Sequence, residues 1–141
     1  MYHYRKTRKS YRALNASDTT KPVCTLCDED NKPRIIRETT TMILLPNRVS
    51  YDIFEGMRVV EHLMIVPKRH VEHIEDFTNQ EKMDFMSLAG EFEMKGFNVY
   101  ARGAKSATRS VAHQHTHLIK TDNKKAKSVV YIAKPHILIR T

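Results

Sequence analysis

The 141-residue sequence has no long apolar run and no tryptophan. No stretch approaches the roughly 18 consecutive apolar residues of a membrane-spanning helix. The charged N-terminus is not followed by the apolar segment that a secretory signal peptide requires. We therefore expect no membrane contact and a cytoplasmic location. The hydrophobic share of 40% and the charged share of 28% are ordinary for one globular domain of this length.

Cysteine is also scarce, since only Cys24 and Cys27 occur. In a chain without an export signal, two cysteines this close together indicate a metal-binding or redox element rather than a structural disulfide. The net charge is +8 and the isoelectric point is near 9.6. This charge favours polyanions, which include both nucleic acid and the phosphate chain of a nucleotide.

The first part of the chain, residues 1–21, is basic, with interleaved tyrosines and a polar end. This composition predicts a flexible arm rather than part of a core. Such an arm can bind RNA through phosphate contacts and tyrosine stacking, or it can stay a solvated tail. Residues 22–141 are then expected to form the folded domain.

Sequence patterns in this domain predict strands and one main helix. Apolar and β-branched residues favour extended structure over residues 34–46, 57–66, 97–100 and 111–119. The strand over 57–66 is too apolar to lie at a sheet edge. Thr78 and Glu81 form a capping box that begins a helix, and Gly96 ends it. Basic loops are expected over residues 101–109 and 120–127.

The chemically most informative pattern is the alternation of His113, His115 and His117. In a strand, alternate side chains share one face and stand about 7 Å apart. Three imidazoles on one surface are costly to desolvate unless they bind metal, phosphate or one another. Zinc competes with phosphate as an explanation, because imidazole is a common zinc ligand.

Three segments of the sequence resemble one family. Ser110-Val-Ala-His113-Gln-His115-Thr-His117 resembles the signature of the histidine triad (HIT) family. The segment from His62 to His70 looks like the family's histidine, apolar strand and Pro-Lys-x-His element. Cys24-Thr-Leu-Cys27 looks like the cysteine pair of its zinc-containing members. The matches occur in the family's order over about two thirds of the chain.

This resemblance implies an α+β, HIT-like fold: an antiparallel sheet of about five strands, one main helix and, usually, a homodimer. It also implies a hydrolase of nucleoside phosphate derivatives, either a dinucleoside polyphosphate or a nucleoside phosphoramidate, with a purine nucleotide expected. In such enzymes the middle histidine attacks the α-phosphorus, which makes His115 the expected nucleophile. A neutral imidazole nitrogen is a good nucleophile near pH 7, and its phosphoramidate divides one difficult displacement into two easier ones.

Other residue roles follow from the same resemblance. His117 would hold the α-phosphate and act as acid for the leaving group, and His62 would support the site from the neighbouring strand. Ser110 would donate a hydrogen bond to the phosphate or to the leaving group. Asn47 is expected to bind the ribose hydroxyls, and Asn98 is expected near the phosphates.

Family zinc sites imply a Cys₂His₂ set made of Cys24, Cys27, His70 and His113. Such a set closes a tetrahedron around one structural zinc per chain and leaves no open position. His73 offers an alternative, because the cysteine pair together with His70 and His73 would form a site that uses no triad residue.

The chain departs from the family pattern in two segments. The link between Asn47 and His62 is longer than usual, and Glu61 replaces the usual glycine before His62. The stretch from Asn98 to Ser110 is expanded and basic, which suits either a longer phosphate chain or a solvated loop. Three alternatives to a hydrolase stay open: a nucleotidyltransferase, a non-catalytic zinc-stabilised nucleotide or RNA binder, and a metal-handling protein.

Overall fold

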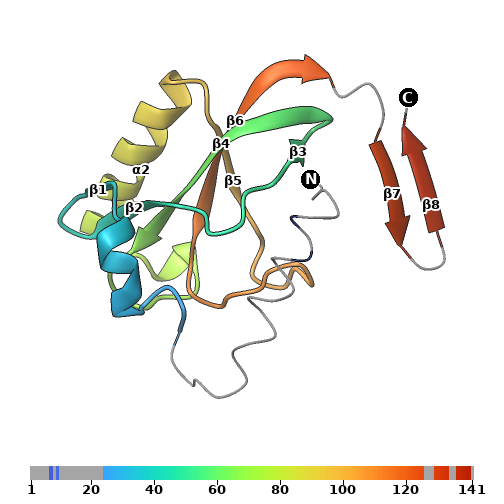
Figure 1. The fold of residues 1–141 in the computed structure, drawn as a ribbon. Helices are drawn as coiled ribbons and strands as arrows, with labels where there is room; N and C mark the ends of the chain where they lie inside the picture. The colour runs from blue at the N-terminus through green and yellow to red at the C-terminus, as the bar shows by residue number, and fades with distance from the viewer. Residues whose placement is uncertain (1–6, 8, 10–23, 126–128, 134–135, 141) are drawn as a thin grey trace.

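Figure 1 shows the protein as a computed structural model that describes Thr7, Lys9 and residues 24–125, 129–133 and 136–140. Apart from Thr7 and Lys9, the basic arm expected over residues 1–21 lies outside the described residues. Thr7 donates a hydrogen bond from its hydroxyl to a carboxylate oxygen of Asp52, at 3.2 Å. No helix in this described part is long and apolar enough to cross a membrane.

The centre of the molecule is a six-stranded sheet in which every pair of neighbours is antiparallel. Its main path runs β1-β2-β4-β6-β5, and the short β3 pairs with β4 beside this path. The strands are β1 (Arg37–Glu38), β2 (Met42–Pro46), β3 (Ile53–Phe54), β4 (Met57–Pro67), β5 (Asn98–Ala101) and β6 (Thr116–Lys125). One α-helix, α2 (Asn79–Met94), and two 3-10 helices, η1 (Glu29–Arg34) and η2 (Ile74–Asp76), complete this part. The expected α+β fold with one main helix is confirmed.

The strand expected over 34–46 is a hairpin of β1 and β2, and a carboxylate of the helix holds its turn. Asp84 of α2 accepts hydrogen bonds from the hydroxyls of Thr39 and Thr41 and from the backbone N–H of Thr41. The hydroxyl of Thr39 holds the pKa of Asp84 at about 2, with the bonds from Thr41 adding to the effect. The hairpin turn and the helix are thus joined through one ionised side chain.

Helix α2 begins at the expected capping box. The Thr78 hydroxyl accepts from the Glu81 backbone N–H, and the Glu81 carboxylate accepts from the Thr78 backbone N–H. Glu81 is buried and forms an ion pair with Arg69 at 2.8 Å, which lowers the pKa of its carboxyl group. The chain leaves the helix through Gly96, at a φ of 83°, a conformation that glycine adopts without a Cβ penalty.

The sheet has two differently used faces. One packs against α2 (Figure 1) and forms the main core, made of Met42, Leu44, Leu63, Ile65, Val71, Phe77, Leu88, Ala89, Phe92, Phe97 and Leu118. The other carries Met64, which pairs with His117, and His62, which pairs with Ile119. Because side chains alternate along strands, His62 and His117 share this second face. The histidines therefore lie opposite the helix.

The strand that carries the histidine triad differs from expectation at both ends. Residues 111–115 are not in a strand, and β6 begins only at Thr116. The carbonyls of Val111 and Ala112 accept hydrogen bonds from the Arg109 side chain, and the Gln114 N–H donates to Val71. Because these backbone groups form hydrogen bonds outside the β-sheet, strand β6 starts later than the sequence pattern indicated.

The segment from Lys120 was expected to be a loop, but it continues β6 as far as Lys125. It pairs with the first half of β4, with irregular register between Met57 and Glu61. An ion pair between Arg58 and Asp122, at 2.6 Å, joins the two strands. Cross-strand pairing thus overrides the local preference of a basic, polar segment for a loop.

The chain ends in a hairpin of β7 (Val129–Ala133) and β8 (His136–Arg140), which form a two-stranded sheet of their own. Figure 1 shows it as the two red strands.

Candidate active site and metal-binding group

The three triad histidines are all buried, but they do not form a single row. His113 and His115 lie in the irregular segment before β6, and His117 is its second residue. The His113 ring faces the two cysteines, whereas the His115 ring meets His117 edge to face with centroids 5.1 Å apart. Because the strand begins only after His115, the expected alternation on one strand face is replaced by two separate groups.

His115 is held by its own backbone neighbourhood. Its Nδ1 lies 2.8 Å from the carbonyl oxygen of His113, and a carbonyl only accepts, so Nδ1 carries the proton. In a neutral ring the lone pair is then on Nε2. Burial lowers the pKa of His115, and the positive charges of Arg109 and Arg102 lower it further, against the opposing effect of the His113 carbonyl. His115 therefore presents an unprotonated Nε2 at neutral pH.

A chain of hydrogen bonds determines which ring nitrogens of His62 and His117 carry protons. The backbone N–H of Tyr51 donates to Nδ1 of His62 at 3.1 Å, which in a neutral ring leaves the proton on Nε2. This Nε2 lies 2.9 Å from Nδ1 of His117, which must accept. His117 is consequently protonated on Nε2, a buried atom with no hydrogen-bond partner among the described residues. A buried N–H without an acceptor is costly, so this atom is well suited to a ligand oxygen.

His117 is also strongly biased toward its neutral form. Burial is the main cause that lowers its pKa to about 2; repulsion from His62 and His115 in their protonated forms, and from Arg102, adds to it. Its ring lies between aromatic neighbours: Tyr100 of β5 stacks on it at 6.0 Å, and Tyr51 approaches it at 5.5 Å. The ring is thus fixed in place and uncharged in the free protein.

A second group gathers Cys24, Cys27, His70 and His113, whose ligand atoms all lie within 4.8 Å of one another. The Sγ to Nδ1 distances are 3.3 Å from Cys27 to His113, 3.4 Å from Cys27 to His70 and 3.5 Å from Cys24 to His113. Tetrahedral zinc with ordinary Zn–S and Zn–N bond lengths would separate such atoms by roughly 3.4–3.8 Å. The donor set and its spacing therefore fit that metal.

The surroundings of His113 support the same conclusion. Its Nε2 lies 3.0 Å from the carbonyl oxygen of Pro67 and donates to it, which leaves Nδ1 free of a proton and directed at the cysteines. Burial, with the neighbouring Cys24 adding to it, raises the pKa of the Cys27 thiol. A bound cation would reverse that effect and stabilise the thiolate. His73 lies outside this group, exposed at the start of η2.

Three further residues were expected in the site: Asn47, Asn98 and Ser110. The Asn47 side-chain nitrogen is 3.1 Å from Nε2 of His62, so this residue borders the triad. Asn98, the first residue of β5, donates a hydrogen bond from its side chain to the carbonyl of Ile119 in β6. Ser110 is exposed in the loop that precedes the triad.

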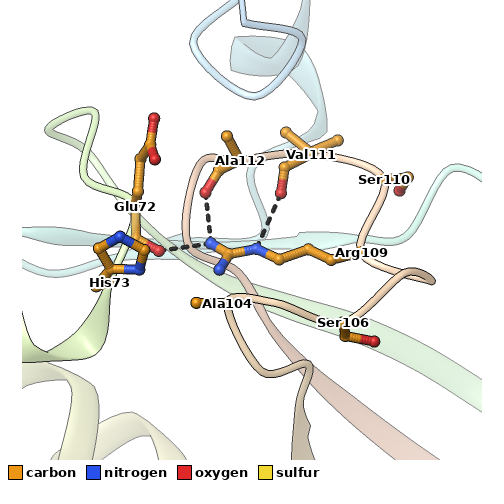
Figure 2. A pocket seen from close by; sticks show the side chains of 8 residues that line it. All are labelled: Glu72, His73, Ala104, Ser106, Arg109, Ser110, Val111 and Ala112. Carbon is orange, nitrogen blue, oxygen red and sulfur yellow. Dashed lines mark hydrogen bonds between the residues drawn. The ribbon is translucent and has the colours of Figure 1, made fainter.

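Ser110 lines a pocket of about 210 Å³ beside this loop, together with Glu72, His73, Ala104, Ser106, Arg109, Val111 and Ala112. Figure 2 shows the Arg109 guanidinium group reaching across it toward the carbonyls of Glu72 and Ala112, while its Nε donates to Val111. Arg109 also reaches the side chain of Gln114. This arginine acts as a brace that joins the loop, the triad segment and the turn before η2.

Two contributors were not singled out by the sequence pattern. Tyr51 acts through its backbone N–H and its ring, neither of which a motif can reveal, although it lies in the segment that departs from the family pattern. Asn31 is buried, accepts from Arg34 and Arg48 and donates to the carbonyl of Thr25, so it holds the loop that carries the cysteines. A buried asparagine in η1 has no distinctive sequence signal.

Comparisons with known proteins show what the chain is similar to. The family model described as the HIT domain matches residues 57–124. Adenosine 5'-monophosphoramidase HNT1 from Saccharomyces cerevisiae is 27% identical over 123 residues, which cover 83% of this chain and 74% of the relative.

Solved structures with similar folds include a HIT family hydrolase from Clostridium thermocellum. Its TM-score is 0.55 at 17% identity, over 77% of this chain and 98% of its own. Another is a diadenosine triphosphate hydrolase from Plasmodium falciparum, with a TM-score of 0.52 at 18% identity, over 67% of this chain and 65% of its own. At these identities the similarity is one of fold.

Proposed function

We propose that this chain, which matches the HIT domain model over residues 57–124 and resembles a yeast relative at 27% identity, is a HIT-type protein that hydrolyses nucleoside phosphate derivatives through a nucleotidyl-histidine intermediate on His115. The observation that carries the proposal is the hydrogen bond from His115 Nδ1 to the His113 carbonyl, because it leaves Nε2 as a neutral nucleophile. The name of the yeast relative, an adenosine 5'-monophosphoramidase, supports an adenine nucleotide as substrate.

In the first step, His115 Nε2 attacks the α-phosphorus, and the bond from phosphorus to the leaving group breaks. The leaving group takes the electron pair. His117 presents its Nε2–H to a phosphate oxygen or to the leaving atom, and His62 holds the opposite nitrogen of that ring. Since the pKa of His117 is about 2 in the free protein, the negative charge of the bound nucleotide would have to raise it before His117 acts as an acid.

In the second step, water attacks the phosphorus, the bond to His115 breaks, and a nucleoside monophosphate is released. The roles of Ser110 in binding the phosphate or leaving group, of Asn47 toward the ribose and of Asn98 toward the phosphates belong to the same proposal.

We further propose that the group of Cys24, Cys27, His70 and His113 holds one structural zinc ion. Its support is the donor set and the atomic separations. Four protein ligands leave no position for substrate, so the ion would supply stability to the segment that carries the triad and no chemistry.

Product analysis tests the proposed function directly. Wild-type protein and a His115→Asn variant would be incubated with diadenosine triphosphate and with adenosine 5'-phosphoramidate. Release of AMP by the wild type alone is the expected result. Repeating the assay of adenosine 5'-phosphoramidate with orthophosphate detects a transferase, which would form ADP in place of AMP; with diadenosine triphosphate, ADP is also the second product of hydrolysis. A protein that binds both nucleotides without turnover would instead be a non-catalytic binder.

A further inference from the structure

Two arginines converge on one buried amide beside the end of β2. Asn31 of η1 is 3% exposed, and its side-chain oxygen accepts hydrogen bonds from Arg34 Nη1 at 3.1 Å and from Arg48 Nη2 at 3.3 Å. Nη2 of Arg34 also donates to the carbonyl of Pro46, the last residue of β2, at 2.7 Å. Neutral acceptors therefore hold the two guanidinium groups close to each other.

The buried amide keeps this arrangement in place. Its nitrogen donates to the carbonyl of Thr25 at 2.8 Å, so the side-chain oxygen of Asn31 must point the other way, toward the arginines. Arg34 is half-buried and Arg48 is exposed, so a ligand can reach the pair from solvent. Each guanidinium group keeps N–H donors that no residue in the described part of the chain uses.

No carboxylate among the described residues neutralises the pair. Arg34 and Arg48 bind the neutral oxygens of Asn31 and Pro46. Burial lowers the pKa of Arg34, and the positive charge of Arg48 lowers it further. An anion bound between the two groups would remove this repulsion. Three other arginines form ion pairs instead: Arg37 with Glu91, Arg58 with Asp122 and Arg69 with Glu81.

The presence of two guanidinium groups favours a phosphate group over a carboxylate as the anion. One guanidinium group is sufficient for a carboxylate, since Arg69 donates to both oxygens of Glu81. Two guanidinium groups held side by side present donors from two directions, and a tetrahedral phosphate group offers oxygens to both.

We propose that Arg34 and Arg48, oriented by Asn31, form a phosphate-binding site separate from the histidines. Neither arginine is among the charges that lower the pKa of His115 and His117. The phosphate group can belong to a small phosphorylated ligand or to the backbone of RNA, and binding measurements distinguish these two sources. The site does not depend on the hydrolytic function proposed above, because binding here requires no turnover.

The first test is an NMR titration of the full chain with inorganic phosphate. The side-chain Nε–H signals of Arg34 and Arg48 should shift and reach saturation, because both groups have donors left for an anion. The signal of Arg37 should not shift, since that residue is already paired with Glu91. Absence of a saturable shift at both arginines of the pair in the wild-type protein overturns the proposal.

The second test compares variants by the same titration. Arg48→Gln should weaken phosphate binding, followed at Arg34, by about tenfold or more, because it removes one of two charged donors. Lys32→Gln removes a positive charge from the same 3-10 helix, where Lys32 pairs with Glu29, and should change the affinity by less than about twofold. Unchanged affinity in Arg48→Gln, or equal losses in both variants, overturns the proposal.

Arg48→Lys provides a check that does not depend on the loss of charge. It keeps the positive charge but loses the planar donors, so it should bind phosphate less tightly than the wild type and more tightly than Arg48→Gln. Melting temperatures of all variants show whether a loss of binding reflects unfolding. Wild-type affinity in Arg48→Lys would contradict the proposed two-arginine geometry.

A labelled single-stranded RNA distinguishes the two sources of the phosphate group. If the backbone of RNA is the ligand, Arg48→Gln should weaken binding alike for different sequences and reduce the slope of log affinity against log salt concentration by about one. If Arg48→Gln loses phosphate binding while RNA binding is unchanged, the site stands and takes a small phosphorylated ligand. If neither phosphate nor RNA binding responds to Arg48→Gln, the proposal is wrong.

Discussion

At the scale of single residues, the protein controls protons through backbone groups. The carbonyl of His113 selects the tautomer of His115, and the N–H of Tyr51 selects that of His62 and, through it, that of His117. Backbone groups keep their donor or acceptor role at any pH, so they select the tautomer of each ring while that ring is neutral. This is the physical basis for treating His115 Nε2 and His117 Nε2–H as distinct chemical groups.

His115→Asn is expected to abolish turnover while leaving the fold and nucleotide binding largely intact. Asparagine keeps some hydrogen-bonding capacity but has no basic ring nitrogen to attack phosphorus. The rate constant for the chemical step should fall by orders of magnitude, rather than KM merely rising. Intact-mass measurement with a slow substrate should reveal an acid-labile nucleotide adduct on the wild type only. Near-normal turnover by the variant would disprove this mechanism.

Stability should fall as the pH drops from 7 to 5, and His117 supplies one identifiable part of that loss. Its pKa is about 2 in the folded protein and near 6.5 when unfolded, so between these values only the unfolded state binds the proton. For one such group the free energy of unfolding falls by roughly 2 kcal/mol over this interval. Urea unfolding at several pH values measures it. In His117→Gln the slope with pH should be shallower, and an unchanged slope would count against the assignment.

At the scale of elements, the sequence predicted the position of those helices and strands that local interactions determine. The capping box of α2 and the interior strand β4 lie where expected, because a hydroxyl three residues before a carboxylate and a continuous apolar run act locally. The predicted start of β6 was wrong, because the Arg109 side chain donates hydrogen bonds to the carbonyls of Val111 and Ala112, which a strand would have used for its ladder.

The candidate site also contains residues that the sequence could predict and residues that it could not. The histidines and cysteines could be identified because their residue types and spacing are rare. The contact between Tyr51 and Arg102 could not be identified, because it joins residues 51 positions apart through a fold that neither segment specifies alone. In the sequence, these two segments differed from the family pattern mainly by their greater length.

Thr78→Ala should destabilise the protein by about 0.5–2 kcal/mol, because it leaves the N–H of Glu81 without its capping acceptor. The measurement is the midpoint of urea unfolding at constant m-value. Ser87→Ala is the matched control, since Ser87 is exposed in the middle of the same helix and alanine is a better helix former. Equal destabilisation by both substitutions would show that the cap contributes nothing specific.

The segment with the cysteines should depend on metal for its stability. We expect one zinc per chain in protein purified without chelator, measured by elemental analysis, and a lower melting temperature after chelation. Cys27→Ser should lower both zinc content and melting temperature, because it removes a ligand from the four-residue group. His73→Ala should change neither, since His73 lies outside that group. Protein that contains no zinc, or that keeps zinc without Cys27, would contradict the proposed ligand set.

At the scale of the whole molecule, one face of the sheet packs against α2 to form the main core, and the opposite face carries His62 and His117 beside two smaller buried apolar clusters. The short edge strand β5 pairs only with β6 among the strands that the structure describes, and Val99 on it is 43% exposed. An edge strand of this kind can pair with a second copy, which is in keeping with the homodimer expected from the resemblance.

We expect sedimentation equilibrium at micromolar concentration to give a mass near twice that of the 16.5 kDa chain. Val99→Lys on the exposed edge should shift the equilibrium toward the single chain if β5 lies in the interface, because a charged residue there opposes strand pairing. A single-chain mass for the wild-type protein would exclude the dimer. The two alternatives for the basic arm of residues 1–21, RNA binding and a solvated tail, are distinguished by comparing RNA binding of full-length and truncated chains at varied salt concentration.

His113 has a consequence for how variants of this protein are interpreted. Its ring belongs to the proposed metal-binding group, while its backbone carbonyl orients the ring of His115, the proposed nucleophile. A substitution at this position removes the ring and would displace the carbonyl through the loss of the metal, so we expect reduced activity without a direct role of the side chain in the reaction. A mutational scan scored by activity alone would classify His113 as catalytic, and only a parallel measurement of protein abundance would separate a damaged scaffold from damaged chemistry.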